Sequence, residues 1–407
     1  MDKRRATCAA QLSGGYTVST LAATSFLPFH VASIEEEEIQ AVVEVLRSGW
    51  LTTGPRTKKF EASFAEYVGA THAVTLSSCT AALHLALAAI GLQEGDEVIL
   101  PTMTFSSTGQ VVCYFKARPV LVDCELNSFQ ICPEALERAI TPRTRAVIPV
   151  HHAGCPSDMD RILDIARRHG IKVIEDAAHA LPASYKGKRI GSLSDITCFS
   201  FYATKTLTTG EGGMITTENP AYADRIRILS LHGISKDAYK RYTAEGSWRY
   251  EILEVGYKYN MTDIQAALGL VQLAKCDAMR EKRAAIAAQY QALLSPVEGF
   301  VLPTAPPHLS HAWHLYVLQI DERFYSVGRD TFIEELKQRG IGTSVHFIPL
   351  HSHPLYNQRF GYRLGQFPNA ERHFAGAISL PLYPSMTSVD IAKVAEALTE
   401  IAFKFRR

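Results

Sequence analysis

The sequence predicts an α/β protein with one large domain on a mostly parallel sheet and a small α+β C-terminal domain. From about residue 70 to 216, short apolar runs alternate with stretches of helical periodicity. This alternation is typical of a parallel sheet covered by helices on both faces. It stops after Pro220, and a stretch dense in proline begins at Pro296. The 407 residues are 47% hydrophobic, which is enough for two or three domains with buried cores.

The elements of the large domain follow from its apolar pattern. The predicted strands are His72–Leu76, Glu97–Leu100, Pro119–Val122, Ala146–Val150, Lys172–Glu175, Thr197–Phe201 and Gly213–Thr216. The predicted helices are Ala81–Ile90, Pro133–Ile140, Ser157–Arg168, Ala221–Leu231 and Thr262–Leu294. Thr262 and Gln265 have the spacing of a capping box, which marks the start of the last of these helices.

The domain boundaries are placed by changes in composition. We expect a disordered leader over residues 1–25, a large domain with an interdomain helix over 26–295, and a small domain over 296–407. The predicted elements of the small domain are strand Trp313–Ile320, helix Asp330–Arg339, strand Gly342–Phe347 and helix Ser388–Phe403.

Composition also argues against several kinds of partner. Lys and Arg exceed Asp and Glu by only 42 − 41 = 1, so no basic surface for nucleic acid is predicted. No apolar run approaches the roughly 20 residues that cross a bilayer. The 8 cysteines show no C-x-x-C pattern and no zinc spacing, which favours reduced thiols and no metal site. We therefore expect a cytoplasmic protein that binds neither nucleic acid nor membranes.

Two charged residues follow predicted strands of the large domain. Asp176 ends an apolar strand, at the edge where open α/β sheets bind ligands. Its carboxylate could hold a protonated ring nitrogen or a metal, or it could cap the next segment. Lys205 lies between an apolar strand and a glycine-rich loop. Partial desolvation there would make its amine nucleophilic, although a lysine can also cap loop carbonyls.

Two further segments sit at strand ends. Ser77–Ala81 opens a predicted helix, where hydroxyls and free N–H groups suit a phosphate but also serve as ordinary caps. Phe105 follows another strand, where it could stack on a flat ligand or pack in the core. A phosphate site, a stacking ring, an acid for a ring nitrogen and an amine for an aldehyde together describe a pyridoxal phosphate site.

In their order along the chain, these motifs resemble the DegT/DnrJ/EryC1/StrS family of sugar aminotransferases, from about Phe26 to the C-terminus. The matching stretches are Ser48–Pro55, Ser78–Ala81, Glu175–His179, Ser200–Gly213 and Gly256–Asp263. The resemblance implies the type I aminotransferase fold with pyridoxal 5'-phosphate as cofactor. Within the family, the chain is most similar to the enzymes that form UDP-4-amino-4-deoxy-L-arabinose. This similarity rests on the run Gly256–Asn260, on His311–Leu315, and on Gly340–Thr343 followed by His346.

The resemblance also assigns roles to single residues. Lys205 would bind the cofactor aldehyde and then transfer protons, Asp176 would pair with the pyridine nitrogen, and His179 would lie beside the ring. The implied cofactor contacts in addition to these are Ser78, Thr80, Ala81, Phe105, Ser200 and Asn260. Asn260 would reach the phosphate from the neighbouring subunit, which implies a homodimer with shared active sites. The candidate substrate contacts are His311, His314, His346 and Tyr316.

The implied reaction moves an amino group from glutamate to a nucleotide-linked 4-keto sugar, in cell-surface or natural-product biosynthesis. Amination at another sugar carbon or of a cyclitol, a sugar dehydratase, and a regulatory protein on the same fold stay open as alternatives. Dehydratases of the family have His in place of this lysine, so Lys205 favours transamination. Cys79 and Tyr202 depart from the family pattern, and Tyr202 leaves the sugar open.

Overall fold

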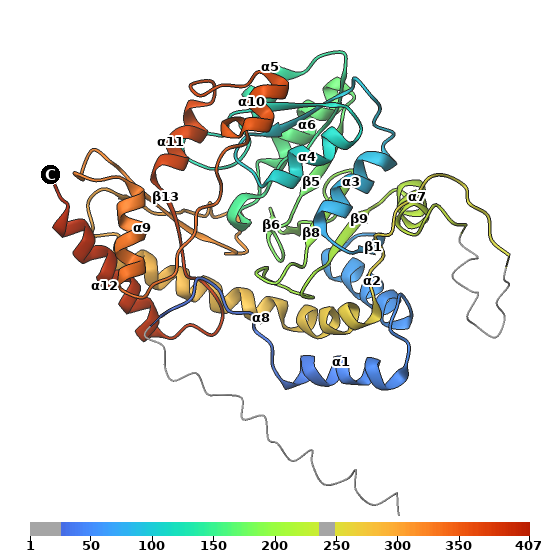
Figure 1. Cartoon of the computed structure of the whole chain (residues 1–407), viewed down its shortest axis with the longest axis horizontal. Coiled ribbons are helices and arrows are strands. Elements are labelled where there is room, and N and C mark those ends of the chain that lie inside the picture. Colours follow the sequence, from blue (N-terminus) through green and yellow to red (C-terminus); the bar gives the residue numbers. More distant parts are fainter. Residues whose placement is uncertain (1–25, 236–248) are drawn as a thin grey trace, which may run out of the picture.

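The computed structural model describes residues 26–235 and 249–407, so the predicted leader lies outside the described residues. A seven-stranded sheet occupies the centre of the molecule (Figure 1). Helix α8, Asp263–Leu294, runs along one side of this sheet and continues to the C-terminal elements, where it packs against α12, Ser388–Lys404 (Figure 1). The hydroxyl of Thr262 and the side chain of Gln265 cap α8 reciprocally, which confirms the predicted capping box.

The large sheet is mostly parallel, as predicted. Its strand order is β1-β9-β8-β5-β4-β2-β3, and only β9 runs antiparallel to its neighbours β1 and β8. The strands are β1 His72–Leu76, β2 Glu97–Pro101, β3 Arg118–Val122, β4 Thr144–Val147, β5 Lys172–Asp176, β8 Ile196–Ser200 and β9 Gly213–Thr217.

Side chains of alternate strand residues pack into two separate cores, one on each face of the sheet. Val98 and Leu100 of β2 pack into the core under helices α3 and α4, whereas Ile99 between them packs into the core of the other face. The helices that contribute to the first core are α3 Cys79–Ala89, α4 Ser106–Tyr114 and α7 Pro220–Ser230. Those on the other face are α2 Pro55–Val68, α5 Pro133–Ala139, α6 Met159–His169 and part of α8, against which α1 Glu36–Ser48 also packs.

A second, antiparallel sheet forms the core of the C-terminal region. Its order is β10-β12-β13, with β10 Phe300–Val301, β12 Tyr316–Ile320 and β13 Ala377–Leu380. The core beneath it also takes side chains from the end of α8, from α9 Arg329–Gln338 and from α12. A third small sheet links the two regions, because β11 Leu309–Ser310 pairs with β6 Ser184–Tyr185, which pairs with β7 Lys188–Arg189.

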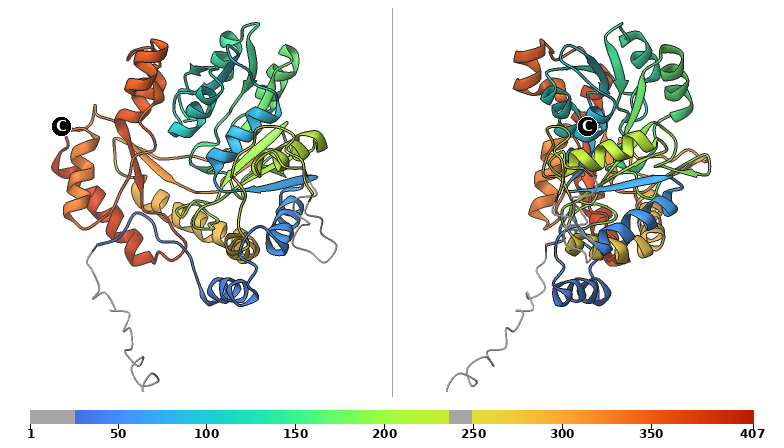
Figure 2. Two further views of the ribbon diagram at one scale, coloured as in Figure 1. Left: turned by 45° about the vertical axis from the view of Figure 1, so that its right-hand side comes forward. Right: turned by 90° about the vertical axis from the view of Figure 1, so that its right-hand side faces the viewer.

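Part of the C-terminal region returns to the large sheet. Helices α10 Pro354–Phe360 and α11 Pro368–Gly376, drawn in red-orange, lie beside the helices of the large sheet (Figure 2). Tyr356 and Phe367 pack into the same core as α3. The part of the chain that the structure describes also contains short 3-10 turns at His152–Gly154 and Leu350–Ser352.

Two predictions in the C-terminal region are wrong in detail. The predicted strand Gly342–Phe347 is irregular, because this segment and Ile341 before it pair only through single bridges from Ile341 to Leu27 and from Ser344 to Ser379. The strand predicted from Trp313 begins at Tyr316, because Trp313 has a φ of 50°, outside the extended region.

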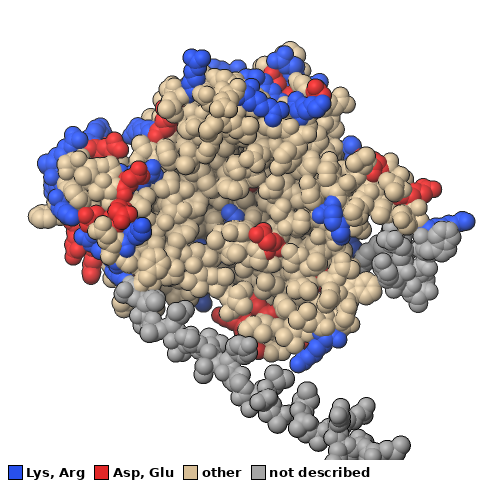
Figure 3. All heavy atoms as spheres, viewed as in Figure 1, with Lys and Arg blue, Asp and Glu red and all other residues tan. Residues whose placement is uncertain are grey.

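The surface agrees with the near-zero net charge. On the face shown in Figure 3, charged side chains gather over α9 and α12 and along the upper edge, while the middle is largely uncharged. Among the described residues, no helix combines the length and the apolar character that crossing a bilayer requires.

Candidate active site

A cavity of about 480 Å³ opens at the carboxyl ends of β5 and β8. The position follows from the topology, because parallel strands direct the residues after their carboxyl ends to one edge of the sheet. The predicted site residues that line this cavity are Ser78, Thr80, Phe105, Asp176, His179, Ser200, Lys205, His314 and His346. The chain therefore brings together residues that are up to 268 positions apart, taking 346 − 78 = 268.

Asp176 is the last residue of β5 and is buried at the floor of the cavity. Its backbone is fixed by the sheet, since its N–H donates to the carbonyl of Pro149 at 2.9 Å. Carboxylate Oδ2 accepts a hydrogen bond from Thr108 Oγ1 at 2.8 Å, and Oδ1 accepts one from the Ala178 N–H at 3.2 Å. Burial raises the pKa of Asp176, while these two donors and nearby Lys205 oppose that rise.

Lys205 lies in the loop after β8, held by a hydrogen bond from its own N–H to the carbonyl of Tyr202 at 2.9 Å. Among the described residues, its side chain forms no ion pair. Burial lowers the pKa of Lys205 to about 8, although the nearby Cys79 and Asp176 act in the opposite direction. A neutral amine is the reactive form of lysine toward an aldehyde, so this environment suits covalent chemistry.

The start of α3 lies at one side of the cavity. Ser78 caps this helix, and its Oγ accepts the Ala81 N–H at 3.1 Å. The predicted phosphate donor Ala81 thus uses its N–H within the cap, whereas Cys79 and Thr80, at the first two helical positions, have no intrahelical acceptor for theirs. Gly213 of β9 allows the close approach, because a Cβ there would lie 2.5 Å from the Ser78 carbonyl.

Neutral imidazoles form another wall of the cavity. The rings of His179 and His314 are 4.4 Å apart, and the pKa of each is lowered well below the usual value by burial and by Lys205. Burial, followed by Lys205, lowers the pKa of His346 to about 4. These side chains are therefore uncharged at neutral pH and act as hydrogen-bonding groups. Because the Ala153 N–H donates to His179 Nδ1 at 3.3 Å, the proton of neutral His179 lies on Nε2.

Two of the candidate substrate residues lie elsewhere. His311 is buried, accepts the Trp313 N–H on Nδ1 at 2.7 Å, and stacks on the Trp313 ring at 4.1 Å. It lines a different cavity, of about 610 Å³, between the two regions of the chain. Tyr316 packs in the core of the C-terminal region. The positive φ of Trp313 explains why His311 and His314, three residues apart, face different cavities.

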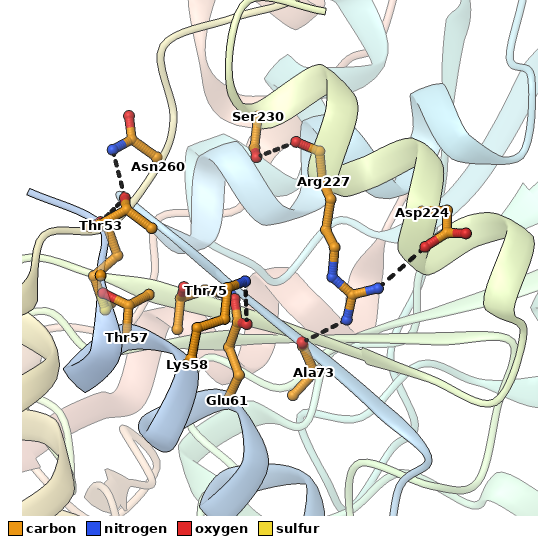
Figure 4. Close-up of polar contacts among 12 residues, drawn as sticks. Thr53, Thr57, Lys58, Glu61, Ala73, Thr75, Asp224, Arg227, Ser230 and Asn260 are labelled. Atoms are coloured by element: carbon orange, nitrogen blue, oxygen red, sulfur yellow. Dashed lines mark hydrogen bonds and ion pairs between the residues drawn. The ribbon is translucent and has the colours of Figure 1, made fainter. Parts of the chain in front are cut away.

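Asn260 also lies outside the cavity of Lys205. It lines a cavity of about 260 Å³ together with Thr53, Lys58 and Arg227. Asn260 Nδ2 donates to Thr53 Oγ1 at 2.8 Å, and Figure 4 shows the amide directed at that hydroxyl. Within one chain, the amide of Asn260 therefore does not contribute to the site around Lys205.

The structure adds lining residues that the sequence did not single out. They include Phe29, Thr104 and Phe347. Thr108, which the sequence also did not single out, lies behind Asp176 and bonds to its carboxylate. Thr104 and Thr108 lie four residues apart around Phe105, a spacing that places both on one face of a helix start. That spacing was the available signal, whereas nothing in the local sequence marks Phe29 or Phe347.

Comparisons with known proteins agree with this geometry. A family model described as the DegT/DnrJ/EryC1/StrS aminotransferase family matches residues 32–399. The chain is 54% identical over 382 residues to an uncharacterized protein of Methanocaldococcus jannaschii, covering 94% of this chain and 99% of that one. It is 52% identical over 377 residues to the spore coat polysaccharide biosynthesis protein SpsC of Bacillus subtilis strain 168, covering 92% and 97%.

A solved structure extends the likeness to three dimensions. Spr1654 of Streptococcus pneumoniae superposes with a TM-score of 0.87 at 34% identity, over 93% of this chain and 99% of that one in its PLP form. The same protein has also been solved in PMP and apo forms, with the same TM-score. The likeness therefore extends over both regions of the chain.

Proposed function

Since the chain belongs to the DegT/DnrJ/EryC1/StrS aminotransferase family, we propose that it transfers an amino group from glutamate to a nucleotide-linked 4-keto sugar. Membership makes it a sugar aminotransferase with pyridoxal phosphate as cofactor. The glutamate donor and the 4-keto sugar nucleotide are the proposal. The observation that carries it is that one cavity holds Asp176, Lys205 and the start of α3.

The residues of this cavity fit the cofactor by their chemistry. A buried carboxylate at Asp176 suits a protonated ring nitrogen, the amine of Lys205 suits an aldehyde, and the N–H groups at the start of α3 with the Ser200 hydroxyl suit a phosphate. When bound, the cofactor supplies a ring that accepts electron density from the carbon carrying the amino group. Phe105, which is half exposed at the rim, is placed to cover a flat ligand.

The two charged residues have distinct tasks in this proposal. Asp176 stays ionised and holds a proton on the ring nitrogen, because its two hydrogen-bond donors favour the carboxylate. Lys205 would take a proton from the substrate carbon and deliver it to the carbon of the bound cofactor that carried the aldehyde, since a base with a pKa of about 8 can both accept and release a proton near neutral pH. A lysine at this position favours transamination over sugar dehydration.

The neutral imidazoles of His314 and His346 suit an uncharged sugar, whose hydroxyls need hydrogen-bond partners rather than ions. SpsC, by its name, acts in polysaccharide biosynthesis, which supports a sugar product that enters a surface polysaccharide. The nucleotide, the aminated carbon and a relation to UDP-4-amino-4-deoxy-L-arabinose or to lipopolysaccharide stay predictions, as does a cytoplasmic location.

The separate position of Asn260 supports a homodimer with shared sites. Because this amide faces a second cavity in its own chain, it can serve a phosphate only if another copy brings its site there. In the proposed dimer, each Asn260 completes the site of its partner.

A half-reaction tests the proposal. Protein loaded with pyridoxal phosphate should be yellow, and glutamate without a sugar should bleach this colour while releasing 2-oxoglutarate in a single turnover. A panel of UDP-, dTDP- and GDP-linked 4-keto sugars should then contain one that restores the colour and gains an amino group, as read by mass spectrometry. Colour that glutamate does not bleach would rule out glutamate as the donor.

Lys205→Ala is the control for this experiment. The variant should neither retain the cofactor covalently nor turn over, because no other lysine of residues 26–235 and 249–407 lines the cavity. Turnover by Lys205→Ala would refute the assigned role of this lysine, even if the family assignment held.

A further inference from the structure

We infer that Thr108 is a positioning residue that keeps Asp176 ionised and aimed during transamination, with Thr104 behind it. The inference rests on the proposed function, and it concerns a hydroxyl pair that approaches Asp176 from a different element. Thr108 lies in the first turn of α4, is fully buried, and places Oγ1 at 2.8 Å from Asp176 Oδ2. Thr104 Oγ1 lies 2.8 Å from the same Thr108 hydroxyl.

Counting protons fixes the direction of this chain of hydrogen bonds. An ionised carboxylate only accepts hydrogen bonds, so the single hydroxyl proton of Thr108 must be donated to Asp176. The hydroxyl of Thr104 must then donate to Thr108. If Asp176 were protonated on Oδ2, the chain could reverse, with Asp176 donating to Thr108 and Thr108 to Thr104. The two hydroxyls can therefore serve either protonation state, but the bond from Thr108 to the ionised carboxylate is charge-assisted and so the stronger, which favours ionised Asp176.

The hydrogen bond from Thr108 opposes the rise in the pKa of Asp176 that burial causes, and few other groups at the site do so. Buried Asp176 has one more direct donor, the Ala178 N–H on Oδ1 at 3.2 Å, which is longer than the Thr108 bond. Loss of the Thr108 hydroxyl would leave desolvation less opposed, so a proton shared with the cofactor ring nitrogen would move toward Asp176. A ring nitrogen without its proton accepts electron density less well.

The backbone of Asp176 does not depend on Thr108, which makes the inference testable by substitution. The Asp176 N–H donates to Pro149 at 2.9 Å, and its carbonyl accepts the His151 N–H at 3.1 Å. On the other side, the Ala177 N–H donates to Cys198 at 2.8 Å. These bonds belong to the sheet and persist when a side chain of α4 changes.

The experiment compares four forms loaded with pyridoxal phosphate that carries ¹⁵N in its ring: wild type, Thr108→Val, Thr108→Ser and Thr102→Val. The ¹⁵N chemical shift reports ring protonation directly, independently of turnover. Thr108→Val should show a reduced fraction of protonated ring nitrogen at neutral pH and a kcat about 10- to 100-fold lower, with little change in the KM of the sugar. Thr108→Ser keeps the hydroxyl and should restore both readouts.

Thr102→Val is the matched control. Thr102 is also fully buried and lies on the same segment, but its hydroxyl bonds to His351 at 2.8 Å rather than to Asp176. Its substitution should change stability without changing the ¹⁵N shift. If Thr108→Val does not fold, Thr104→Val, which breaks only the outer link, should give a smaller shift of the same sign.

Two results would overturn the inference: wild-type ring protonation in Thr108→Val and Thr104→Val, or equal losses in the Ser and Val variants of Thr108. Failure of the proposed function would look different. In that case the wild type itself would bind no cofactor at Lys205 or would not react with glutamate.

Discussion

The charged residues of the cavity around Lys205 and those of the cavity around Asn260 differ in whether they form ion pairs. In the first, Asp176 is buried and Lys205 is partly buried, and the described residues give neither an ion-pair partner. In the second, Lys58 Nζ lies 3.0 Å from Glu61 Oε2, and Arg227 Nη1 lies 3.4 Å from Asp224 Oδ1 (Figure 4).

The difference separates reactive groups from supporting ones. Burial without a counterion moves the pKa of Asp176 up and that of Lys205 down, which prepares both groups for proton transfer. Paired charges near solvent contribute little energy and little reactivity. The paired charges of the cavity around Asn260 therefore suit a supporting role beside a reactive site, as the proposed shared sites require.

Removing the charge of Asp176 should have the largest effect on this contrast. Asp176→Asn can still accept from Thr108, but it cannot hold a proton on a ring nitrogen. We expect the rate constant of the glutamate half-reaction to fall by about 100-fold or more, as measured by rapid mixing and the loss of visible absorbance.

Its matched control is Glu175→Gln, at the preceding position of β5. Glu175 is fully buried, and it bonds to His151, Ser194 and Thr197 at 2.7–2.9 Å. This variant should unfold more easily yet retain a half-reaction rate within a few-fold of the wild type. An equal loss of rate in both variants would mean that the strand, rather than the carboxylate at its end, determines the rate.

Mixed dimers test whether the second cavity serves the first. Lys205→Ala and Asn260→Asp should each be inactive or weakly active, because a carboxylate at residue 260 would repel a phosphate. If Asn260 acts across the dimer, a hybrid of the two variants contains one site with both native residues. Random exchange of subunits should then restore roughly a quarter of the wild-type activity.

The outcome depends only on which chain supplies Asn260. If Asn260 serves its own chain, every site in the hybrid carries one substitution, and mixing restores nothing. Equal amounts of the unmixed variants, assayed separately and summed, provide the baseline. A mixture that stays at this baseline after proven subunit exchange would contradict the shared sites.

The contrast between the cavities also shows what sequence could and could not predict. Asp176, Lys205 and Ser78 follow strands whose apolar pattern is local, so the edge of the sheet where they meet was predictable. Thr108 was missed because its partner Asp176 is 68 residues away in the sequence.

The apolar pattern of the sequence gives wrong predictions where the backbone departs from regular geometry. The positive φ of Trp313 turns His311 away from the cavity, although the sequence placed it with His314. The segment Gly342–Phe347 has strand-like residues, yet only a single bridge from Ser344 pairs with β13. Neither feature leaves a periodic signal in the sequence.

The smallest expected effect concerns stability rather than rate. Burial lowers the pKa of Lys205 from 10.5 to about 8 in the folded protein, so between these values the unfolded chain binds more protons. Folding stability of the cofactor-free protein should therefore gain from this residue as pH rises from about 8 to 10.5, and the cost should be fully present below about 8. Lys205→Met, which carries no charge, should be more stable than the wild type by about 1–3 kcal/mol at neutral pH.

Denaturant unfolding of both forms across this pH range measures the difference, which should vanish as pH approaches the ordinary lysine value. Lys58→Gln, from the second cavity, is the control, because it removes a half-exposed ion pair worth less than about 1 kcal/mol. Its effect should not follow the same pH course. A Lys205→Met protein no more stable than the wild type at neutral pH would show that Lys205 keeps its charge at little cost. The contrast between the two cavities would then rest on Asp176 alone.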